Sequence, residues 1–410
     1  MTEIIAFAQN TALFIISFVL VLGLVVTIHE LGHFQVARWL NVKCDAFSIG
    51  FGKAIWRWHD KKGTVWQICR WPLGGYVKFA GDANVSSSPS DSDLARWEDK
   101  AARRQLQSEG LFHFQPIWRR SLIVAAGPLA NFVLAIGIFA VFYLTVGERL
   151  PPARVDQVVA GSPAQQAGFQ PADIILAANG RPVHSFEDVR LIVMLRAGTP
   201  IDFTILRGQS NIKLSATPIR KEVEDGLSGK RKIGVLGLES HPTADDLKLV
   251  RYDLLGALKR GSEQTASIIA TAGTYFSRVF AGKEDGTEIS GPVAIAVTPG
   301  KLAASVANLQ PANASLWSRL ADIGAALALF SAVLSVSIGL TNLLPIPVLD
   351  GGRLVLYALE AVRGRPLSGS AEGVFFRLGL VAILLLAVFA TWNDLNRFGI
   401  FNHLQVLNAS

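Results

Sequence analysis

Four long runs of apolar residues interrupt the otherwise mixed sequence of this 410-residue chain. They cover residues 12–28, 121–146, 323–344 and 373–392, and each is close to or above the length of roughly 20 residues that a membrane-spanning helix requires. The residues before the first run include Glu3 and no Lys or Arg, so we interpret that run as a retained span and not as a cleaved signal peptide. The pattern predicts a polytopic α-helical membrane protein with about four transmembrane helices.

Between these runs the pattern changes to shorter elements. Residues 45–58 and 63–71 alternate partly between apolar and polar positions, which favours strands, and residues 72–79 continue this pattern after a break at Pro72. We therefore expect a β segment beside the membrane. Farther along, mostly apolar residues recur at helical spacing from Leu247 to Phe280, which favours an amphipathic helix.

Composition excludes an ordinary soluble enzyme, because half of the residues are hydrophobic, only 17% are charged and the mean hydropathy is +0.36. Lys and Arg are concentrated between the first two spans and recur between the last two, at Arg363 and Arg365. The positive-inside rule places both segments in the cytoplasm and the long central segment outside it. We interpret the net charge of +7 as a sign of orientation and expect no nucleic-acid partner. Cys44 and Cys69 are expected to be free cytoplasmic thiols.

The sequence thus predicts eight segments in chain order. They are a first transmembrane helix at 1–40, a cytoplasmic membrane-associated β segment and loop at 41–116, a second transmembrane helix at 117–147, an extracytoplasmic domain at 150–220, an amphipathic helical region at 240–316, a third transmembrane helix at 319–352, a cytoplasmic connection at 353–372 and a fourth transmembrane helix at 373–393.

The extracytoplasmic domain carries a recognisable motif, "GSPAQQAGFQPADIILAANGRPV", at residues 161–183. It lies within a predicted order of strand, short helix, strand, helix and strand over residues 153–209, with the second helix expected from Ser185 to Leu195. This order resembles a bacterial PDZ domain. The resemblance implies a groove that receives an extended peptide as an added strand.

The motif "HELGH" places a polar cluster at the end of the first span. His29 and His33 are one helical turn apart and project from the same face, so both imidazoles can reach one metal ion, while Glu30 can contact a water molecule on that ion. This is the arrangement of a zinc hydrolase, in which the Glu accepts a proton from the water. The alternative is a pair of hydrogen-bonded core histidines, which the cost of ionisable residues at membrane depth disfavours.

A catalytic zinc site needs a third protein ligand. Asp350 is our candidate, because it directly follows the third span, where Pro345 and Pro347 break the helix and two glycines allow a close approach. Asp322 and Glu360 are rival acids, but the first is expected at the outer end of its span and the second precedes basic, solvent-like sequence. The alternative for Asp350 itself is an ordinary turn aspartate.

Taken together, these motifs resemble a site-2 protease of the bacterial RseP type. The resemblance covers most of the chain and is carried by "HELGH", "FSIGFG", "PLGGYVKF", "GPLANF", "NLLPIPVLDGG" and the PDZ-like segment. It implies that His29, His33 and Asp350 are ligands of Zn²⁺ and that Glu30 is the catalytic base.

The resemblance also implies a substrate class and a location. It associates Asn342, Pro345 and Pro347 with substrate binding, and it implies cleavage of the transmembrane segments of single-pass proteins, such as anti-sigma factors and signal-peptide remnants, in regulated intramembrane proteolysis. The expected location is a bacterial cytoplasmic (inner) membrane, among membrane lipids, with the PDZ domain outside the cytoplasm and the metal site nearer the cytoplasmic side. One PDZ domain stands where the best-known member has two in tandem, which affects substrate gating more than chemistry.

A substrate helix has every amide bonded internally, so it must unwind before a carbonyl can reach the metal. The strand-like run from Ile68 to Phe79 and the Asn342 side chain are candidates for holding the unwound segment. We interpret Gly127, Pro128 and Asn131 in the second span as helix-packing residues.

Two other classes of protein remain as alternatives. The first is a non-catalytic membrane scaffold that uses its PDZ domain to hold other proteins, against which the complete "HELGH" argues. The second is a metal transporter, which lacks support because ionisable residues do not recur across several spans.

Overall fold

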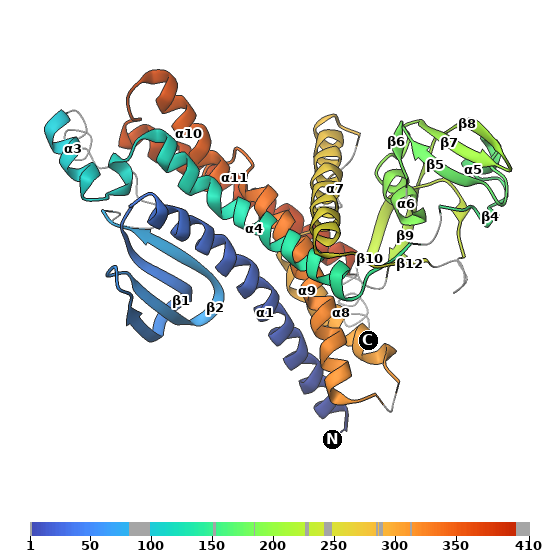
Figure 1. Ribbon diagram of the computed structural model, residues 1–410, viewed down its shortest axis with the longest axis horizontal. Coiled ribbons are helices and arrows are strands. Elements are labelled where there is room, and N and C mark those ends of the chain that lie inside the picture. The colour runs from blue at the N-terminus through green and yellow to red at the C-terminus, as the bar shows by residue number, and fades with distance from the viewer. Residues whose placement is uncertain are drawn as a thin grey trace, which may run out of the picture. The chain divides into compact units, whose positions relative to one another are not determined.

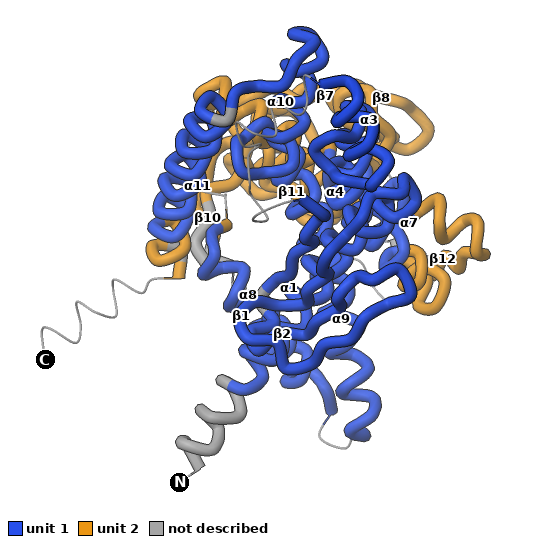
Figure 2. The backbone as a smooth tube through the Cα atoms, turned by 90° about the vertical axis from the view of Figure 1, so that its left-hand side faces the viewer, with its two compact units in different colours: residues 1–139, 261–269, 291–392 blue, residues 140–260, 270–290, 393–410 orange. Residues whose placement is uncertain are grey.

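The computed structural model describes residues 2–81, 99–150, 153–183, 185–225, 229–241, 248–283, 286, 290–311 and 314–398. The chain forms two compact units, which Figure 2 shows in different colours. Unit 1 comprises residues 1–139, 261–269 and 291–392, and unit 2 comprises residues 140–260, 270–290 and 393–410. The loop expected within the 41–116 segment falls at residues 82–98, which lie outside the described residues.

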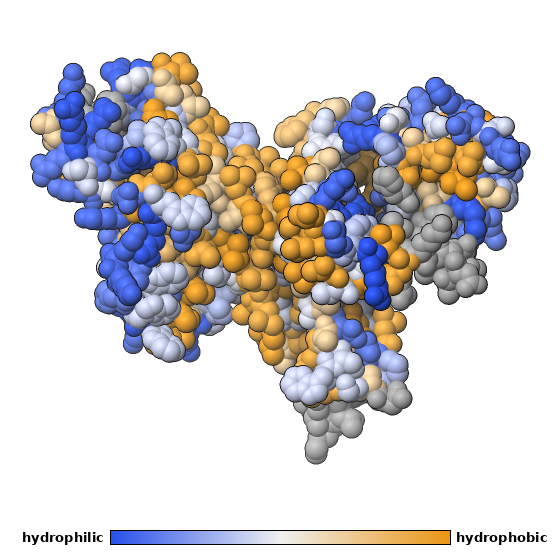
Figure 3. Space-filling model, in the orientation of Figure 1, coloured by the Kyte–Doolittle hydropathy of each residue, from blue (hydrophilic) through white to orange (hydrophobic). Residues whose placement is uncertain are grey.

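Four helices in the described part of the chain are long and apolar enough to cross a membrane. They are α1 (Thr2–Trp39), α4 (Ile117–Thr145), α9 (Leu316–Asn342) and α11 (Gly369–Arg397), and each corresponds to one of the four apolar runs. Large apolar side chains are exposed on their surfaces, and Figure 3 shows hydrophobic residues gathered along the long helices. Exposed apolar area costs about 25 cal/mol per Å² in water, so this surface fits lipid. The polytopic helical architecture is confirmed.

Glycines let the backbones of α1, α4 and α9 approach closely within unit 1. A methyl group built on Gly32 of α1 would lie 2.9 Å from the carbonyl carbon of Ala126 in α4. One built on Gly339 of α9 would lie 3.0 Å from the carbonyl oxygen of Pro128 in α4. Close packing of this kind is how helices associate where lipid removes the hydrophobic driving force. It brings the side chains of "HELGH" directly onto α4.

Beside α1 lies a curled β-hairpin of β1 (Cys44–His59) and β2 (Val65–Phe79), as Figure 1 shows. The predicted break at Pro72 is wrong, because β2 continues through it. The pairing with β1 is irregular around this point, with shifts between Ile49 and Ala54, so the missing N–H of proline interrupts no regular ladder.

The register of this hairpin leaves one edge of β2 free. Residues 46–49 of β1 pair with residues 65–68 of β2 on one side and with residues 75–78 on the other, whereas residues 54–59 of β1 pair with 65–69. Residues 65–68 therefore have strand partners on both sides. Within the described part of the chain, residues 75–79 are paired on one side only, and we call this the free edge of β2.

Both cysteines lie in the hairpin, and both are buried and free, as expected. Burial raises the pKa of the Cys44 thiol to about 12, so this thiol stays protonated at neutral pH. A protonated, buried thiol is a poor nucleophile and a poor metal ligand. Cys44 is therefore a packing residue.

Shorter helices complete unit 1. They are α3 (Lys100–Ser108), the 3₁₀ helix η1 (Phe112–Phe114), α8 (Pro292–Leu309) and α10 (Asp350–Arg363). α10 occupies much of the segment that the sequence treats as a connection, and it ends at Gly364, whose φ of 71° provides a left-handed C-cap. A buried ion pair of 2.6 Å between Arg120 of α4 and Glu360 of α10 joins these two helices.

Unit 2 is built mainly from short strands. They are β3 (Glu148–Leu150), β4 (Gln157–Val158), β5 (Ile174–Ala178), β6 (Arg181–Pro182), β7 (Ile201–Arg207), β8 (Ser210–Ala216), β9 (Ile219–Asp225), β10 (Gly229–Val235), β11 (Leu238–Glu239) and β12 (Lys248–Val250). A four-stranded sheet has the order β6-β5-β7-β8, and the other strands form the pairs β4–β11, β9–β10 and β3–β12. Unit 2 also contains the helices α5 (Pro163–Gln166) and α6 (Phe186–Met194). A capping box at Ser185 starts α6, close to the start predicted for this helix.

The core of unit 2 shows where its domain ends. Val155, Ile175, Phe203 and Ile205 are almost fully buried there, and Leu236 packs in the same cluster. β11 also pairs with β4 at the start of the domain. The predicted boundary at residue 220 is therefore too early, because the fold needs residues up to 239.

The amphipathic helix is shorter than predicted. α7 spans Leu254–Phe280 and begins at Asp253, whose side chain accepts a hydrogen bond from the Gly256 N–H. Leu247 lies outside the described residues, and Lys248–Val250 form strand β12, paired with β3. Apolar spacing alone could not separate this short strand from the helix that follows it.

Candidate metal centre

α1 carries the two histidines of "HELGH" about two turns before its end at Trp39. His29 and His33 are four residues apart, so they lie on one face, with ring centroids 4.8 Å apart. Both residues are buried. The polar face of this helix end is therefore turned into unit 1 and away from lipid.

Asp350 is the first residue of α10, and a tight loop delivers it from α9, which ends at Asn342. Val348 in this loop has a φ of 87°, a left-handed conformation that a β-branched residue rarely adopts. Gly351 lets the loop fold back, because a Cβ there would lie 2.5 Å from the carbonyl carbon of Leu343. The position of Asp350 is therefore fixed by a strained, closely packed turn.

Three side-chain atoms from these two segments meet at one point. Nε2 of His29 lies 3.2 Å from Nε2 of His33 and 3.2 Å from Oδ2 of Asp350, and the third side of the triangle, from His33 to Asp350, measures 3.4 Å. It is the one group of potential metal ligands in the described residues that contains three members.

The dimensions of this triangle fit zinc. Ligand atoms held about 2.0 Å from a tetrahedral ion are separated by about 3.3 Å, and the three measured separations agree with this value. Two imidazoles and a carboxylate also form a common donor set for catalytic zinc.

The hydrogen bonding of the triangle is compatible with a bound cation. Nδ1–H of His33 donates to the Ile123 carbonyl of α4 over 2.8 Å, so Nε2 of a neutral His33 presents a lone pair to Asp350. Oδ2 of Asp350 is buried and has no hydrogen-bond donor among the described residues. Acceptor atoms that converge without a proton between them repel each other, and a bound cation would remove that repulsion.

α4 contributes the wall behind the histidines. Gly127 leaves room for both rings, because a Cβ at this position would lie 2.5 Å from Cε1 of His33 and 2.9 Å from Cε1 of His29. Asn131, one turn farther along α4, is fully buried with its amide 3.3 Å from Nδ1 of His29. Sequence reasoning treated both as packing residues, although the motif "GPLANF" was a signal that they belong to the site.

Glu30 points from α1 toward the hairpin. Its carboxylate accepts a hydrogen bond from the main chain of Val77, and its Cγ lies 3.5 Å from the place where a Cβ on Gly75 would be. Both contacts are made with the free edge of β2. Glu30 thus lies next to the histidines in sequence and next to an unpaired strand edge in space.

The residues associated with substrate binding follow α9. Asn342 is its last residue, and its side-chain amide has no hydrogen-bond partner within the part of the chain that the structure describes. Pro345 is exposed, whereas Pro347 packs against α11, where a Cβ on Gly379 would lie 2.6 Å from the Pro347 carbonyl carbon. Asn342 and Pro345 are thus accessible, and Pro347 holds the loop against α11.

The rival acids lie elsewhere. Asp322 accepts a hydrogen bond from Gln310 over 2.5 Å at the exposed start of α9, and Glu360 forms the buried ion pair with Arg120. The other described histidines are outside the triangle; they are His59, His113 and His241. His184 and His403 lie outside the described residues.

Comparison with known proteins identifies the family of the chain. The chain matches Peptidase family M50 over residues 17–386. It is 43% identical over 391 residues to Metalloprotease MmpA of Caulobacter vibrioides, an alignment that covers 94% of this chain and 96% of that protein. It is 40% identical over 383 residues to Atu1380 of Agrobacterium fabrum (93% and 96% covered) and 36% identical over 387 residues to RC0203 of Rickettsia conorii (93% and 98%), whose names place both among the zinc metalloproteases.

A membrane protein with these four helices and these relatives is a zinc metalloprotease, and its cofactor is zinc. The chain belongs to peptidase family M50, the family of the site-2 proteases, as its motifs indicate. The scaffold and transporter alternatives are thereby excluded.

Proposed function

We propose that His29, His33 and Asp350 hold the catalytic zinc ion and that Glu30 is the general base of peptide hydrolysis. The observation that carries the proposal is the triangle of ligand atoms with sides of 3.2, 3.2 and 3.4 Å. Zinc bound there would polarise the scissile carbonyl and lower the pKa of a water molecule to about 7. With zinc bound, Glu30 would be the group that takes a proton from the attacking water and gives it to the amine that leaves when the C–N bond breaks.

The free edge of β2 is the proposed binding place for the substrate. An unwound transmembrane segment exposes N–H and C=O groups, and an unpaired strand edge can bond them as an added strand. Because Glu30 is hydrogen-bonded to Val77 on this edge, a peptide bound there would pass beside the catalytic base. Ile68 already has partners on both sides, so we restrict the substrate-binding strand to residues 75–79, with Asn342 as a second partner for the substrate backbone.

The proposed substrates are single-pass membrane proteins. Ionisable ligands near the end of a membrane span suit a peptide bond that itself lies at membrane depth. This reaction is the core of regulated intramembrane proteolysis, and anti-sigma factors and signal-peptide remnants are the substrate types that the family resemblance implies.

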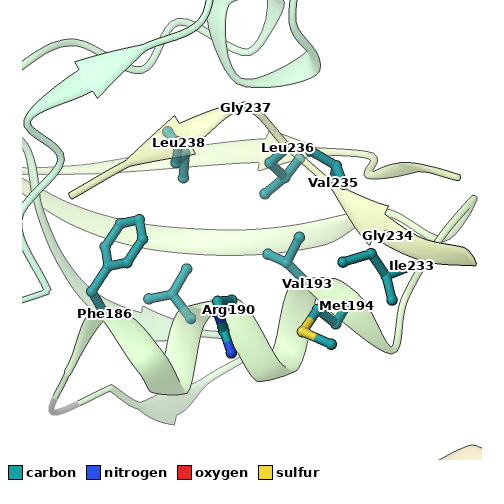
Figure 4. Close-up of a pocket in the computed structure, with 11 residues that line it drawn as sticks. Phe186, Arg190, Val193, Met194, Ile233, Gly234, Val235, Leu236, Gly237 and Leu238 are labelled. Carbon is teal, nitrogen blue, oxygen red and sulfur yellow. The ribbon is translucent and has the colours of Figure 1, made fainter. Parts of the chain in front are cut away.

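We further propose that residues 153–239 of unit 2 form a PDZ domain. Figure 4 shows a groove between α6 and the opposite chain segment, lined by Phe186, Arg190, Val193, Met194 and residues 233–238. Its largely apolar lining, along the side of a helix, suits the side chains of an extended peptide. The domain starts eight residues after α4 ends at Thr145, so we propose that it restricts access of untrimmed substrates to the membrane-embedded site.

The proposed orientation places residues 41–116 and 353–372 in the cytoplasm and unit 2 outside it, in a bacterial inner membrane, with the metal site nearer the cytoplasmic side. A membrane-impermeant thiol reagent added from outside tests this proposal. In a chain whose two native cysteines are replaced by Ser, it should label Ser210→Cys and leave Ser108→Cys unlabelled. The opposite labelling would overturn the orientation.

The catalytic proposal is tested by measuring zinc content and cleavage together on detergent-purified protein. Glu30→Gln should retain zinc and lose cleavage of a single-span substrate, because Glu30 is not a ligand and glutamine cannot accept the proton. His29→Ala should lose both zinc and cleavage. Proteolysis by the Glu30 variant above the metal-free background would remove this residue from the mechanism.

A further inference from the structure

Asn131 is a fully buried polar residue in the middle of a membrane-spanning helix. Its side-chain amide lies 3.3 Å from Nδ1 of His29, and its other amide atom, Oδ1, is buried without a hydrogen-bond partner in the described residues. An unpaired buried polar atom costs about 1–3 kcal/mol in either amide orientation, so the orientation depends on whether His29 offers the amide a donor.

The metal centre determines which donor this is. Nε2 of His29 points at His33 and Asp350, so it must carry a lone pair to bind a cation, and the single proton of the neutral ring then sits on Nδ1. That proton faces the Asn131 amide. The oxygen and nitrogen of an amide are interchangeable by a half-turn, and with the oxygen toward His29 the Nδ1 proton has an acceptor.

The contacts of α9 with Asn131 do not involve its side-chain amide. The Ser335 hydroxyl of α9 donates to the Asn131 carbonyl over 2.9 Å, and Gly339 packs against the Asn131 side chain, where a Cβ would lie 3.3 Å from that of Asn131. Neither contact involves the side-chain amide. The amide is therefore left to His29.

We infer that Asn131 is a positioning residue of the metal centre, whose amide oxygen accepts the Nδ1 proton of His29 and so fixes the ring with Nε2 toward zinc. His33 has an equivalent acceptor in the Ile123 carbonyl. Both proposed imidazole ligands are thus oriented by α4, one through the main chain and one through a side chain. This inference rests on the proposed assignment of His29 as a ligand.

Zinc affinity of the full-length protein tests the inference. Detergent-purified protein is stripped of metal and titrated with zinc against a chromogenic chelator. Asn131→Leu removes the acceptor at similar volume and should lower the affinity by about 10- to 100-fold. Asn131→Asp keeps an oxygen in the same place and should retain an affinity close to that of the wild type.

Ser335→Ala is the matched control, because it removes a buried hydrogen bond to Asn131 and leaves the amide free to bond His29. It should lower the melting temperature of the metal-free protein without changing zinc affinity. If Asn131→Leu does not fold, Asn131→Ser replaces it, since the shorter side chain cannot reach Nδ1.

Two results would overturn the inference: wild-type zinc affinity in a folded Asn131→Leu or Asn131→Ser protein, or an equal loss of affinity in Asn131→Asp. His29→Ala separates this failure from that of the proposed function. Loss of zinc in His29→Ala together with an unaffected Asn131→Leu refutes only the role of Asn131. Retention of zinc in His29→Ala refutes the ligand assignment itself.

Discussion

Replacing Gly127 by Ala tests how closely the metal centre is built against α4. The new Cβ would lie 2.5 Å from Cε1 of His33, and nearer still to Nε2 of the same ring. Ordinary contacts of a Cβ begin near 3.4 Å, so the ring must retreat by at least roughly 0.9 Å. Metal–ligand distances tolerate changes of only about 0.2 Å, so this displacement takes Nε2 out of binding range.

The cost can be bounded from packing. Inserting a methyl group into a filled site costs about 1–3 kcal/mol, and α4 cannot move away easily because Gly32 already holds it against α1. If this cost falls on the zinc-bound state, affinity drops by about 5- to 150-fold. Proteolysis should fall at least in parallel.

Competition titration with a zinc chelator and cleavage of a single-span substrate measure the two effects. Gly137→Ala is the matched control on the same helix, since a Cβ there meets no atom within 4 Å. It should leave both quantities unchanged and stabilise α4 slightly. Zinc affinity of Gly127→Ala within twofold of the wild type would show that the histidines have room to spare, and the packing argument would be refuted.

Three further predictions concern other parts of the molecule. Asp350→Asn should weaken zinc binding more than the loss of a residue that only orients a ligand, which costs roughly 10- to 100-fold, because Asp350 is itself the proposed anionic ligand. Unchanged zinc affinity would make Asp322 or Glu360 the candidate ligand instead. Deletion of residues 153–239 should leave cleavage largely intact for a substrate whose outer domain has been removed, and it should increase cleavage of the substrate that still carries that domain. If the deleted protein is folded and zinc-loaded but no longer cleaves the trimmed substrate, the domain is a substrate receptor instead. In unit 2, burial of Asp173 works against ionisation, but hydrogen bonds from Arg207 and the Gln170 N–H outweigh it and hold the pKa of this carboxyl below its usual value. The stability that this pair contributes is complete above about pH 4 and is lost as the pH falls through the lowered pKa. Amide exchange of β5 and β7, corrected for intrinsic rate, should therefore rise as the pH falls below about 4 in the wild type, and the rise should be smaller in Asp173→Asn.

Much of the candidate site could be predicted because its residues lie in short motifs that can be recognised without knowing the rest of the fold. His29 and His33 share a helical face through their spacing alone, and the helix is predictable because its apolar run is long. Asp350 was recoverable for a similar reason, since prolines and glycines around a single acid mark a tight turn at the end of a span.

Other parts depend on contacts between distant segments and left little trace in the sequence. Asn131 meets His29 across 102 positions, and Arg120 meets Glu360 across 240. The sequence suggested that Glu360 is exposed to solvent, because basic residues follow it along the chain and its contact with Arg120 cannot be inferred from them. The strand break predicted at Pro72 was wrong for the same reason. Whether a proline interrupts a strand depends on how that strand pairs with its neighbour, here β1, and the local pattern does not specify this pairing.

The separation of the proposed ligands along the chain has a consequence for biosynthesis. His29 and His33 are synthesised within the first tenth of translation, but Asp350 is added only after α9 has been made. A nascent chain therefore has two imidazoles and no third ligand until most of the protein has been synthesised. On the proposed ligand assignment, an incomplete chain cannot retain zinc as the finished protein does, so the protease stays inactive while its own membrane segments are being inserted.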